Sequence, residues 1–558
     1  SIGVTTTDSK LASDTPDVLP LLSSGSLEKT LRRLPAGAIQ RTLRHGVVPV
    51  AWWPDHVLYA TCGQKGTDYA TDHGLPVMAR IEQHDFHRCV RRVWGQRILR
   101  KATHGLLAAR PQFSAKTRVT GLQMFAFLVF MMCLSLCSML LTASAIWTAA
   151  SALVGMFFLS VVTLRLFCMF PVPPAKAGTT RYLSDMELPL YSVLVPVFRE
   201  TAVLAQLLRA MSHLDYPVEK LEIKIIVEEF DTTLRQALLK IDLLPHIEII
   251  VVPHGSPQTK PRALNYALQF CRGSLLTIYD AEDVPEPRQL REAAHAFANA
   301  GENLACLQAK LIPFNPDENW LTRQFTAEYA TLFGLILPAL AARHLPLTLG
   351  GTSNHFRTRI LRKIGGWDPH NVTEDADLGL RLARAGFRTG VVNSVTYEEA
   401  NTQLANWLHQ RARWLKGFMQ TWLVHMRNPV RTGRELGMTG FWTLQAFTAG
   451  IFLSALFHPI LNAITVWLLL AGSPNISAPS LLLSGLSLEV FLLGYGVTML
   501  AGAKALRQQS FKGWWLTIAT MPFYWLLMSV AAWLALWQFV FAPFTWNKTE
   551  HGLSKLQS

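Results

Sequence analysis

Two long apolar blocks, residues 121–170 and 440–542, divide this chain into soluble-type and membrane-type parts. The first block is almost uncharged, and its halves, Gly121–Ala143 and Ala145–Phe167, are each long enough to cross about 30 Å of hydrocarbon as a helix. Basic residues lie outside both ends of this block, and none lies between its halves. Positively charged flanks stay on the cytosolic side of a membrane. The pattern therefore predicts a multi-span membrane protein whose soluble parts are cytosolic.

Composition and charge agree with this division. Half of the residues are hydrophobic and only 16% are charged, against about 25% in a typical soluble domain. The net charge of +14 is concentrated beside the apolar blocks, at residues 91–118 and 427–434, where it would attract anionic membrane lipid. Without a DNA-binding signature, this charge does not indicate a nucleic-acid partner. The seven cysteines show no metal-ligand spacing and no disulfide framework, as expected for cytosolic parts.

The N-terminal part is predicted to hold a small module. Residues 1–30 are rich in Ser, Thr, Asp and Pro and read as a disordered tail. Residues 31–105 predict an α+β module with strands at Val47–Trp53 and His56–Thr61, followed by a helix. This stretch resembles the second half of the N-terminal domain of type II secretion ATPases, which in some cases binds cyclic di-GMP. The resemblance implies a regulatory role for the module, although the nucleotide-binding motif is not visible, and a purely structural role explains it equally well.

The sequence leaves the number of spans in the C-terminal apolar block undecided. Gly440–Gly472 contains Pro459 and forms either one long span or two short pieces, whereas Ser480–Ala501 is a clean span. Trp514–Ala542 contains Pro522 and forms a span, a bent pair or an interfacial helix. If the tail at 543–558 is cytosolic, the number of crossings is even, so two or four fit better than three.

Residues 185–425 alternate short apolar runs with helix-like segments. This alternation predicts βαβ units around a buried parallel sheet, and such sheets bind ligands at the carboxyl ends of their strands. The predicted strands are Tyr191–Val197, Ile223–Val227, Ile247–Val252 and Leu275–Tyr279.

An acidic run follows the last of these strands. Asp280, Glu282 and Asp283 supply hard oxygen ligands of the kind that Mg²⁺ or Mn²⁺ prefers. Such an ion neutralises the charge on a leaving diphosphate. An acidic helix cap before Pro285 explains the same residues equally well.

Two further clusters carry candidate chemistry. Asp375, beside Glu374 at the start of a predicted helix, is a candidate general base for an acceptor hydroxyl, and a helix cap is the alternative. In Gln410-Arg411-Ala412-Arg413-Trp414, an arginine can clamp a diphosphate and the indole can stack on a sugar ring. A basic amphipathic helix at the membrane surface explains that segment too. Lys260 is a further candidate for diphosphate contact, or else an exposed lysine at a helix start.

The order and spacing of these clusters resemble family 2 glycosyltransferases, in particular the processive membrane synthases of cellulose, hyaluronan and poly-N-acetylglucosamine. The resemblance covers residues 185–425 clearly and the C-terminal spans more loosely, and Pro543–Ser554 looks like the ending common in that group. It implies a GT-A fold, a Rossmann-like α/β sheet beside a membrane channel. The cyclic di-GMP-binding C-terminal domain of bacterial cellulose synthases is missing.

The resemblance also implies a donor site and its metal. Glu229 and Asp231 would contact uridine, and Asp280 and Glu282 would occupy the acidic positions of the metal motif, with Asp283 beside them. The run reads D-A-E-D where the family has D-x-D, and the nucleotide motif reads E-E-F-D where the family has D-D. Lys260 matches a lysine that precedes an Asn-containing helix.

Catalytic and acceptor residues follow from the same resemblance. Asp375 of Thr373-Glu374-Asp375 would be the catalytic base, and Gln410, Arg413 and Trp414 match a Q-x-x-R-W motif that binds the diphosphate and floors the acceptor site. The loop that approaches the acceptor would contain Gly351, Thr352 and Ser353.

The sequence therefore predicts an inverting transferase in a bacterial inner membrane. UDP-glucose is the favoured donor, and a β-linked polysaccharide that crosses the membrane is the favoured product. The implied partners are the growing glycan, membrane lipid, cyclic di-GMP and a periplasmic export partner. A non-processive transferase acting on a lipid or short acceptor, or a non-catalytic scaffold, stays open as an alternative.

Overall fold

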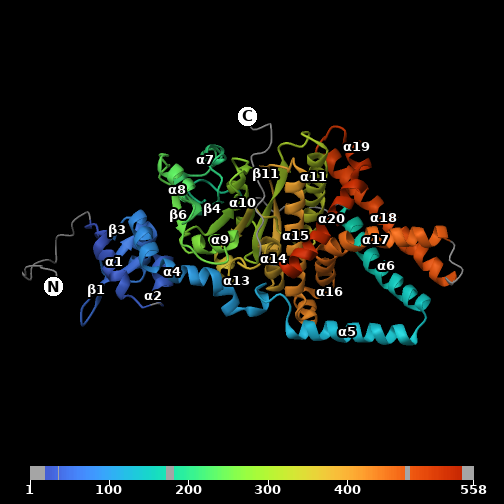
Figure 1. The fold of residues 1–558 in the computed structure, drawn as a ribbon. Coiled ribbons are helices and arrows are strands. Elements are labelled where there is room, and N and C mark those ends of the chain that lie inside the picture. The colour runs from blue at the N-terminus through green and yellow to red at the C-terminus, as the bar shows by residue number, and fades with distance from the viewer. Residues whose placement is uncertain (1–18, 36, 171–180, 472–477, 543–558) are drawn as a thin grey trace, which may run out of the picture. The chain divides into compact units, whose positions relative to one another are not determined.

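The computed structural model describes residues 19–35, 37–170, 181–471 and 478–542 of the chain (Figure 1). The chain divides into two compact units. The first comprises Ser1–Arg100 with Leu268–Arg272, and the second comprises Lys101–Ala267 with Gly273–Ser558. The predictions for residues 543–558, including the family-like ending, lie outside the described residues.

The first unit is an α+β module, as predicted. Strand β1 pairs antiparallel with β2, and β2 pairs parallel with β3. The strands β1 and β2 match the predicted ones to within a residue, whereas β3 was not predicted. The disordered tail predicted for residues 1–30 is wrong from Ser24 onward, because Leu27 and Leu31 bury one face of helix α1 in the core. The elements are α1 Ser24–Arg33, α2 Ala38–His45, β1 Val47–Trp52, β2 Val57–Cys62, α3 Gly63–Asp72, β3 Val77–Ile81 and α4 Gln83–Ala109, which continues into the second unit.

The second unit is built on an eight-stranded sheet in the order β6-β5-β4-β7-β10-β9-β11-β8. Its first four strands are parallel and were all predicted. The prediction of a wholly parallel sheet is wrong, because β10 runs antiparallel to both β7 and β9, and β8 runs antiparallel to β11. The strands are β4 Tyr191–Val197, β5 Leu221–Glu228, β6 Ile247–Val252, β7 Leu275–Ile278, β8 Val284–Pro285, β9 Leu304–Pro313, β10 Asn354–Arg357 and β11 Arg388–Glu398.

Helices pack against this sheet and complete the catalytic-type domain. The main apolar core lies between the parallel strands and the neighbouring helices, with Val193, Ile223 and Leu207 fully buried. Continuous apolar runs such as those of β4 and β5 are typical of strands covered on both faces. The helices are α7 Leu204–Ser212, α8 Thr232–Leu239, α9 Lys260–Leu268, α10 Gln289–Ala298, α13 Thr358–Ile364 and α14 Glu374–Arg384.

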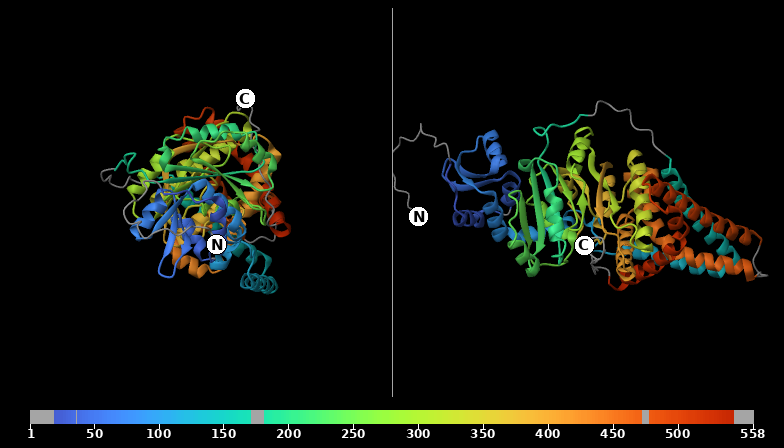
Figure 2. Two further views of the ribbon diagram at one scale, coloured as in Figure 1. Left: turned by 90° about the vertical axis from the view of Figure 1, so that its left-hand side faces the viewer. Right: turned by 90° about the horizontal axis from the view of Figure 1, so that it is seen from above.

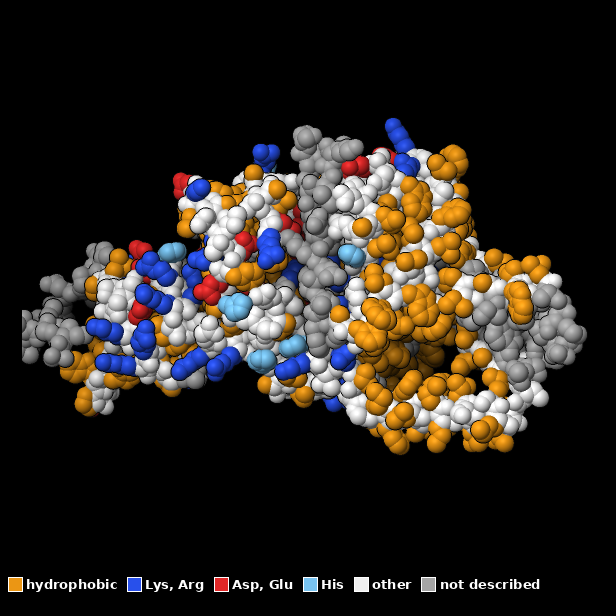
Figure 3. Space-filling view, viewed as in Figure 1, with side chains coloured by type: hydrophobic (Ala, Val, Ile, Leu, Met, Phe, Trp, Pro, Cys, Tyr) orange, Lys and Arg blue, Asp and Glu red, His pale blue; other side chains and the backbone are white. Residues whose placement is uncertain are grey.

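A second group of helices carries the membrane character. Figure 2 shows α6, α17 and α18 extending together away from the sheet, and Figure 3 shows hydrophobic side chains gathered over this part of the surface. These helices are α5 Gly121–Leu140, α6 Ala143–Cys168, α11 Trp320–Thr331, α12 Leu337–Ala342, α15 Leu404–His425, α16 Pro429–Phe447, α17 Ala449–Ala471, α18 Ala478–Gln508, α19 Trp514–Ala519 and α20 Met521–Phe541.

Four helical segments in the described part of the chain are long and apolar enough to cross a membrane, or five if the bent pair Pro429–Phe447 and Ala449–Ile460 is one span. The two predicted N-terminal spans correspond to α5 and α6. The segment Trp320–Ala342, which joins α11 to α12 through a π-helical turn at Leu332–Ile336, was not predicted. The length and composition of these helices are those of membrane spans.

Candidate active site

The predicted site residues converge where strands of the sheet end. Asp280 follows β7, and the loop containing Gly351 leads into β10, the antiparallel neighbour of β7. Because β10 enters the sheet where β7 leaves it, the two segments meet at one edge. Helix α14, which carries Asp375, begins close by: a Cβ added at Gly351 would lie 3.3 Å from Asp375 Oδ2. The glycine therefore lets the loop approach this carboxylate.

Lys260 at the start of α9 links the acidic run to the loop. Its Nζ donates to the Asp280 carboxylate and, at 2.9 Å, to the Gly351 carbonyl. Burial acts against the charge on Lys260, but the carboxylates of Asp280 and Glu374 outweigh it and raise the pKa of Lys260. The lysine thus stays charged and is a buried part of the site.

Glu374, which is buried, and Asp375, which is half-buried, form a carboxyl pair at the first turn of α14. Burial raises the pKa of both groups, and in Glu374 repulsion from Asp375 adds to the rise. The Asp375 Oδ1 atom accepts a hydrogen bond from Ala376 N at 2.7 Å. Oδ2 faces the Gly351 loop. A carboxylate with a raised pKa is a stronger base, which suits proton removal.

Asp283 and Ser353 point into the protein. Asp283 Oδ2 accepts hydrogen bonds from Asp280 N at 3.0 Å and from the Thr352 hydroxyl, and burial raises its pKa well above the usual range. Ser353 is fully buried, and its hydroxyl donates to Thr396 Oγ1 at 2.7 Å. Both residues hold the loop to the strand ends. Neither lines the cavity, so a metal role for Asp283 and an acceptor role for Ser353 find no support here.

The predicted uridine residues lie at the end of β5, apart from the cavity lining. Asp231 is a buried cap of α8 whose carboxylate accepts from Leu234 N at 3.2 Å and from Arg199 N at 2.8 Å. Glu229 is exposed and accepts from His254 N at 2.9 Å. The sequence-based prediction gave no role to the neighbouring Glu228. Both of its carboxylate oxygens accept from Arg262 Nη2 in a buried ion pair.

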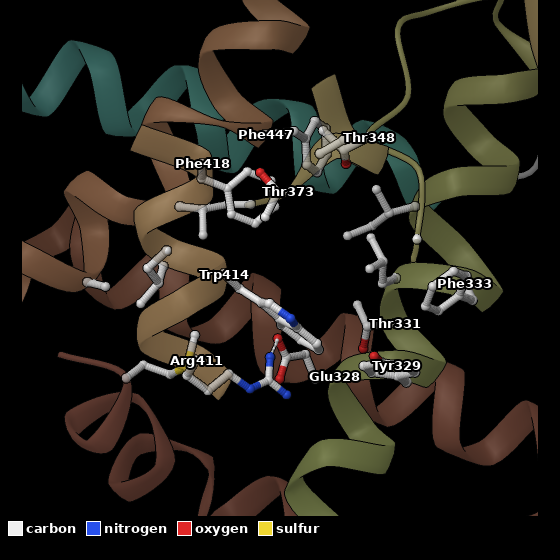
Figure 4. Close-up of a pocket in the computed structure, with 18 of the residues that line it drawn as sticks. Glu328, Tyr329, Thr331, Phe333, Thr348, Thr373, Arg411, Trp414, Phe418 and Phe447 are labelled. Atoms are coloured by element: carbon white, nitrogen blue, oxygen red, sulfur yellow. Dashed lines mark hydrogen bonds and ion pairs between the residues drawn. The ribbon is translucent and has the colours of Figure 1, made fainter. Parts of the chain in front are cut away.

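Helix α15 brings the predicted Gln410, Arg413 and Trp414 to the same cavity. Arg413 interacts electrostatically with the carboxylates of the acidic run and of α14. Arg411, which the sequence analysis named in this segment but did not choose as a site residue, lies over the Trp414 ring at 4.4 Å and donates to Glu328 at 2.7 Å. Figure 4 shows this pair beside the indole. The stack fixes the indole plane from one side.

Glu398 at the end of β11 is another residue of the cavity lining that the sequence did not single out. Burial, followed by repulsion from Glu282, raises its pKa to about 8. No motif marks this residue, because its place depends on where strand β11 ends.

The cavity has a volume of about 460 Å³ and extends from the carboxylates into the helical part of the unit. Four aromatic side chains surround the open space in Figure 4, namely Trp414, Phe418, Phe333 and Phe447. Beyond them it is lined by residues of α6, α17, α18 and α20. The cavity thus joins a charged end to an apolar end within one unit.

Asp280 and Glu282 are the residues that could hold a divalent cation. Both line the cavity, and they offer two hard-oxygen side chains. No group of three or more His, Cys, Asp or Glu side chains arranged for a metal occurs among the described residues. Two carboxylates do fit Mg²⁺, which commonly takes one or two of them and completes its shell with water and substrate phosphates.

Comparisons with known proteins agree with this geometry. The family model "Glycosyltransferase like family 2" matches residues 189–417. A probable glycosyltransferase of Bacillus subtilis, YdaM, is 26% identical over 47% of this chain and 66% of its own length. The β-monoglucosyldiacylglycerol synthase of Synechocystis is 28% identical over 51% of this chain and 60% of its own length. The chain thus covers slightly less than two thirds of these relatives.

Two further similarities cover a smaller share of the relative or have lower identity. The cellulose synthase 1 catalytic subunit of Komagataeibacter xylinus is 25% identical over 45% of this chain and 33% of its own length. The mannosyltransferase PcManGT of Pyrobaculum calidifontis, solved with GDP-Man and Mn²⁺, aligns with a TM-score of 0.43 at 15% identity, over 71% of this chain and 98% of its own. Residues 189–417 thus match a family 2 glycosyltransferase domain, and the relatives that share this region are glycosyltransferases. The expected enzyme class is confirmed at this level.

Proposed function

We propose that this chain is a membrane-embedded inverting glycosyltransferase that uses a nucleotide-diphosphate sugar, with UDP-glucose as the favoured donor. The observation that carries the proposal is the meeting of Asp375, Lys260, Arg413 and Trp414 at the head of a cavity that continues among apolar helices. The charged end suits a diphosphate and the indole suits a sugar ring. The deeper end suits an acceptor that enters from the membrane side.

In this mechanism Asp375 removes the proton from an acceptor hydroxyl. The freed oxygen attacks the anomeric carbon from the face opposite the diphosphate, so the configuration inverts. Arg413 stabilises the charge that develops on the leaving diphosphate. Lys260 holds the Gly351 carbonyl, which keeps the acceptor loop close to the base.

A divalent cation, Mg²⁺ or Mn²⁺, would be held by Asp280 and Glu282, and it would supply charge neutralisation at the diphosphate. Lys260 already occupies one oxygen of Asp280. The chain therefore contributes a fixed cation at this carboxylate in addition to any ion that the donor brings.

The favoured product is a β-linked glucan made processively and passed across the inner membrane. The Q-x-x-R-W segment on α15 and the similarity to a cellulose synthase support polymer formation. The apolar lining of the deeper cavity and the similarity to a β-monoglucosyldiacylglycerol synthase favour a second candidate, transfer of a sugar to a lipid. Cyclic di-GMP at the first unit and a periplasmic export partner remain part of the proposal for the polymer.

The test is UDP release by the purified protein in lipid with Mg²⁺ or Mn²⁺, comparing UDP-glucose, UDP-N-acetylglucosamine and GDP-mannose. Asp375→Asn should abolish release, and the matched control Asp185→Asn, an exposed residue on a surface ion pair, should leave it unchanged. Product size then separates polymer from single transfer. Release that survives in Asp375→Asn would refute the role of Asp375 as the base. No release with any donor, with or without cyclic di-GMP, would favour a scaffold.

A further inference from the structure

The deeper part of the cavity contains a cation inside a membrane-type helix. Arg165 lies on α6 and lines the cavity, and its Nη1 donates to Thr498 Oγ1 of α18 at 2.9 Å. His458 of α17 lines the same part and interacts electrostatically with Arg165. Three helices thus direct polar side chains to one place.

Arg165 forms no ion pair with a carboxylate in the part of the chain that the structure describes. Its described hydrogen-bond partner is a neutral hydroxyl. Arg411, higher in the same cavity, is by contrast paired with Glu328. Charged side chains within spans are costly and as a rule face a partner or a ligand. The contrast between the two arginines indicates that the counter-charge of Arg165 comes from a ligand.

The position of Arg165 indicates the depth of that ligand. Helix α6 ends at Cys168, so Arg165 lies in its last turn, on the side of the membrane where the transferase domain begins. The end of a span lies near the headgroup region of a lipid leaflet, so a lipid phosphate can reach a guanidinium in the last turn. An arginine at a helix end can also reach the interface with its long side chain, but the bond to Thr498 directs this guanidinium into the cavity.

The surroundings of Arg165 are apolar. A hydrated glycan would find few hydrogen-bond partners among these side chains, whereas a hydrocarbon chain would bury them favourably. The lining here includes Phe158, Val161, Val162, Ile451, Ala455 and Met528.

We propose that the deeper cavity binds an anionic lipid, with its phosphate on Arg165 and its hydrocarbon against these apolar side chains. The bound lipid is the first acceptor, and a hydroxyl of its headgroup faces Asp375. This last point rests on the proposed transferase function, whereas the binding site itself does not. The same chemistry is offered by a phosphodiester lipid and by a phosphomonoester lipid, so the experiment compares both.

The binding test uses the full chain in nanodiscs of phosphatidylcholine mixed with either phosphatidylglycerol or phosphatidic acid. Lipids retained after detergent extraction are measured by native mass spectrometry. The wild-type protein should be enriched in the anionic lipid over phosphatidylcholine, and Arg165→Gln should reduce that enrichment at least several-fold. The control Arg343→Gln removes a cation that contacts the Phe167 and Phe170 carbonyls near the same helix end without lining the cavity. It should keep the enrichment.

The site would be overturned if the wild-type protein retained anionic lipid and phosphatidylcholine equally. Unchanged enrichment of the anionic lipid in Arg165→Gln would overturn it as well. Because Arg165→Gln could fold poorly, Thr498→Val serves as a second variant that removes only the hydroxyl partner. It should weaken enrichment by a smaller factor, and no weakening in a folded Thr498→Val protein together with an unfolded Arg165→Gln protein would count against the site.

The acceptor role is tested separately with a radiolabelled donor sugar. Label that appears in the lipid phase with phosphatidylglycerol, and not with phosphatidic acid, which has no headgroup hydroxyl, supports the acceptor role. Lipid enrichment without any donor turnover would mean that the site stands and the proposed function fails. Turnover that yields only water-soluble product, with no lipid enrichment, would mean that the function stands and this inference fails.

Discussion

Gly417 sets the distance between its own helix, α15, which also carries Arg413, and the carboxyl pair of Glu374 and Asp375 at the start of α14. A Cβ added at Gly417 would lie 2.3 Å from Thr373 Cγ2 and 2.8 Å from Thr373 Cβ. Thr373 immediately precedes the two acids of α14. Ordinary contacts begin at 3.4 Å, so Gly417→Ala forces α15 and Thr373 apart by roughly 1 Å, a misplacement that can cost about 100-fold in rate.

The effect on stability has two opposing parts. Alanine gains about 0.8–1 kcal/mol over glycine in a helix, whereas overpacking costs about 1–3 kcal/mol. We expect a net destabilisation of about 0–2 kcal/mol. The matched control is Gly105→Ala in α4, where the added Cβ has a 3.6 Å contact with Lys101 Cγ. That substitution should stabilise by about 0.5–1 kcal/mol and leave activity intact.

The assay is the initial rate of UDP release, measured beside thermal unfolding of the same preparations. Thr373→Ser removes the methyl group that is closest to the new atom, so the double variant should recover part of the lost rate. Since the two residues touch, their effects should not add. If Gly417→Ala retains the activity of Gly105→Ala, the close packing of α15 on the catalytic pair does not control the reaction, and the argument is refuted.

Two further predictions concern stability. Arg262→Ala leaves the Glu228 carboxylate without its two-point partner inside the protein and should cost about 3–5 kcal/mol, whereas Arg359→Ala, at an exposed pair, should change denaturant unfolding little. Burial lowers the pKa of His355 from 6.5 to about 3, so as pH falls through 6.5 the unfolded chain takes up a proton that the folded chain does not. The stability difference between wild type and His355→Gln should therefore shrink between pH 7.5 and pH 5, and a constant difference would contradict the neutral buried histidine.

The parallel half of the sheet could be predicted from sequence because its strands are covered on both faces. Runs such as Tyr191–Val197 are continuous, apolar and bounded by turn residues, so their type and limits are visible. The antiparallel strand β10 could not be predicted in this way. It has only four residues, Asn354–Arg357, and its polar His355 is compatible with burial because Tyr191 and Gln289, both far away in the sequence, bond its two ring nitrogens at 2.7 Å and 3.2 Å.

The sequence predicted which residues belong to the candidate site, but it did not predict which of their side chains face the cavity. Asp280 and Asp283 are the same amino acid three positions apart, and only the fold turns one toward the cavity and the other toward Thr352. The segment Trp320–Ala342 was missed for a related reason. Its charged Arg323 and Glu328 give it a soluble appearance, but each has a partner on a helix far away in the chain, Thr517 of α19 and Arg411 of α15.

Helix α15 connects the apolar helices of the molecule to its candidate site. One face of α15 carries Arg413 and Trp414 into the cavity, and another packs on α20. Because α20 presents small side chains at that contact, the two helices approach closely. The residues there are Ala412 and Leu415 of α15 with Ala531, Ala532 and Ala535 of α20. A shift of α20 would therefore move the diphosphate-side cation and the sugar platform together, and through Gly417 it would move the catalytic pair as well. The packing of the apolar helices and the geometry of the candidate site are thus set by the same contacts.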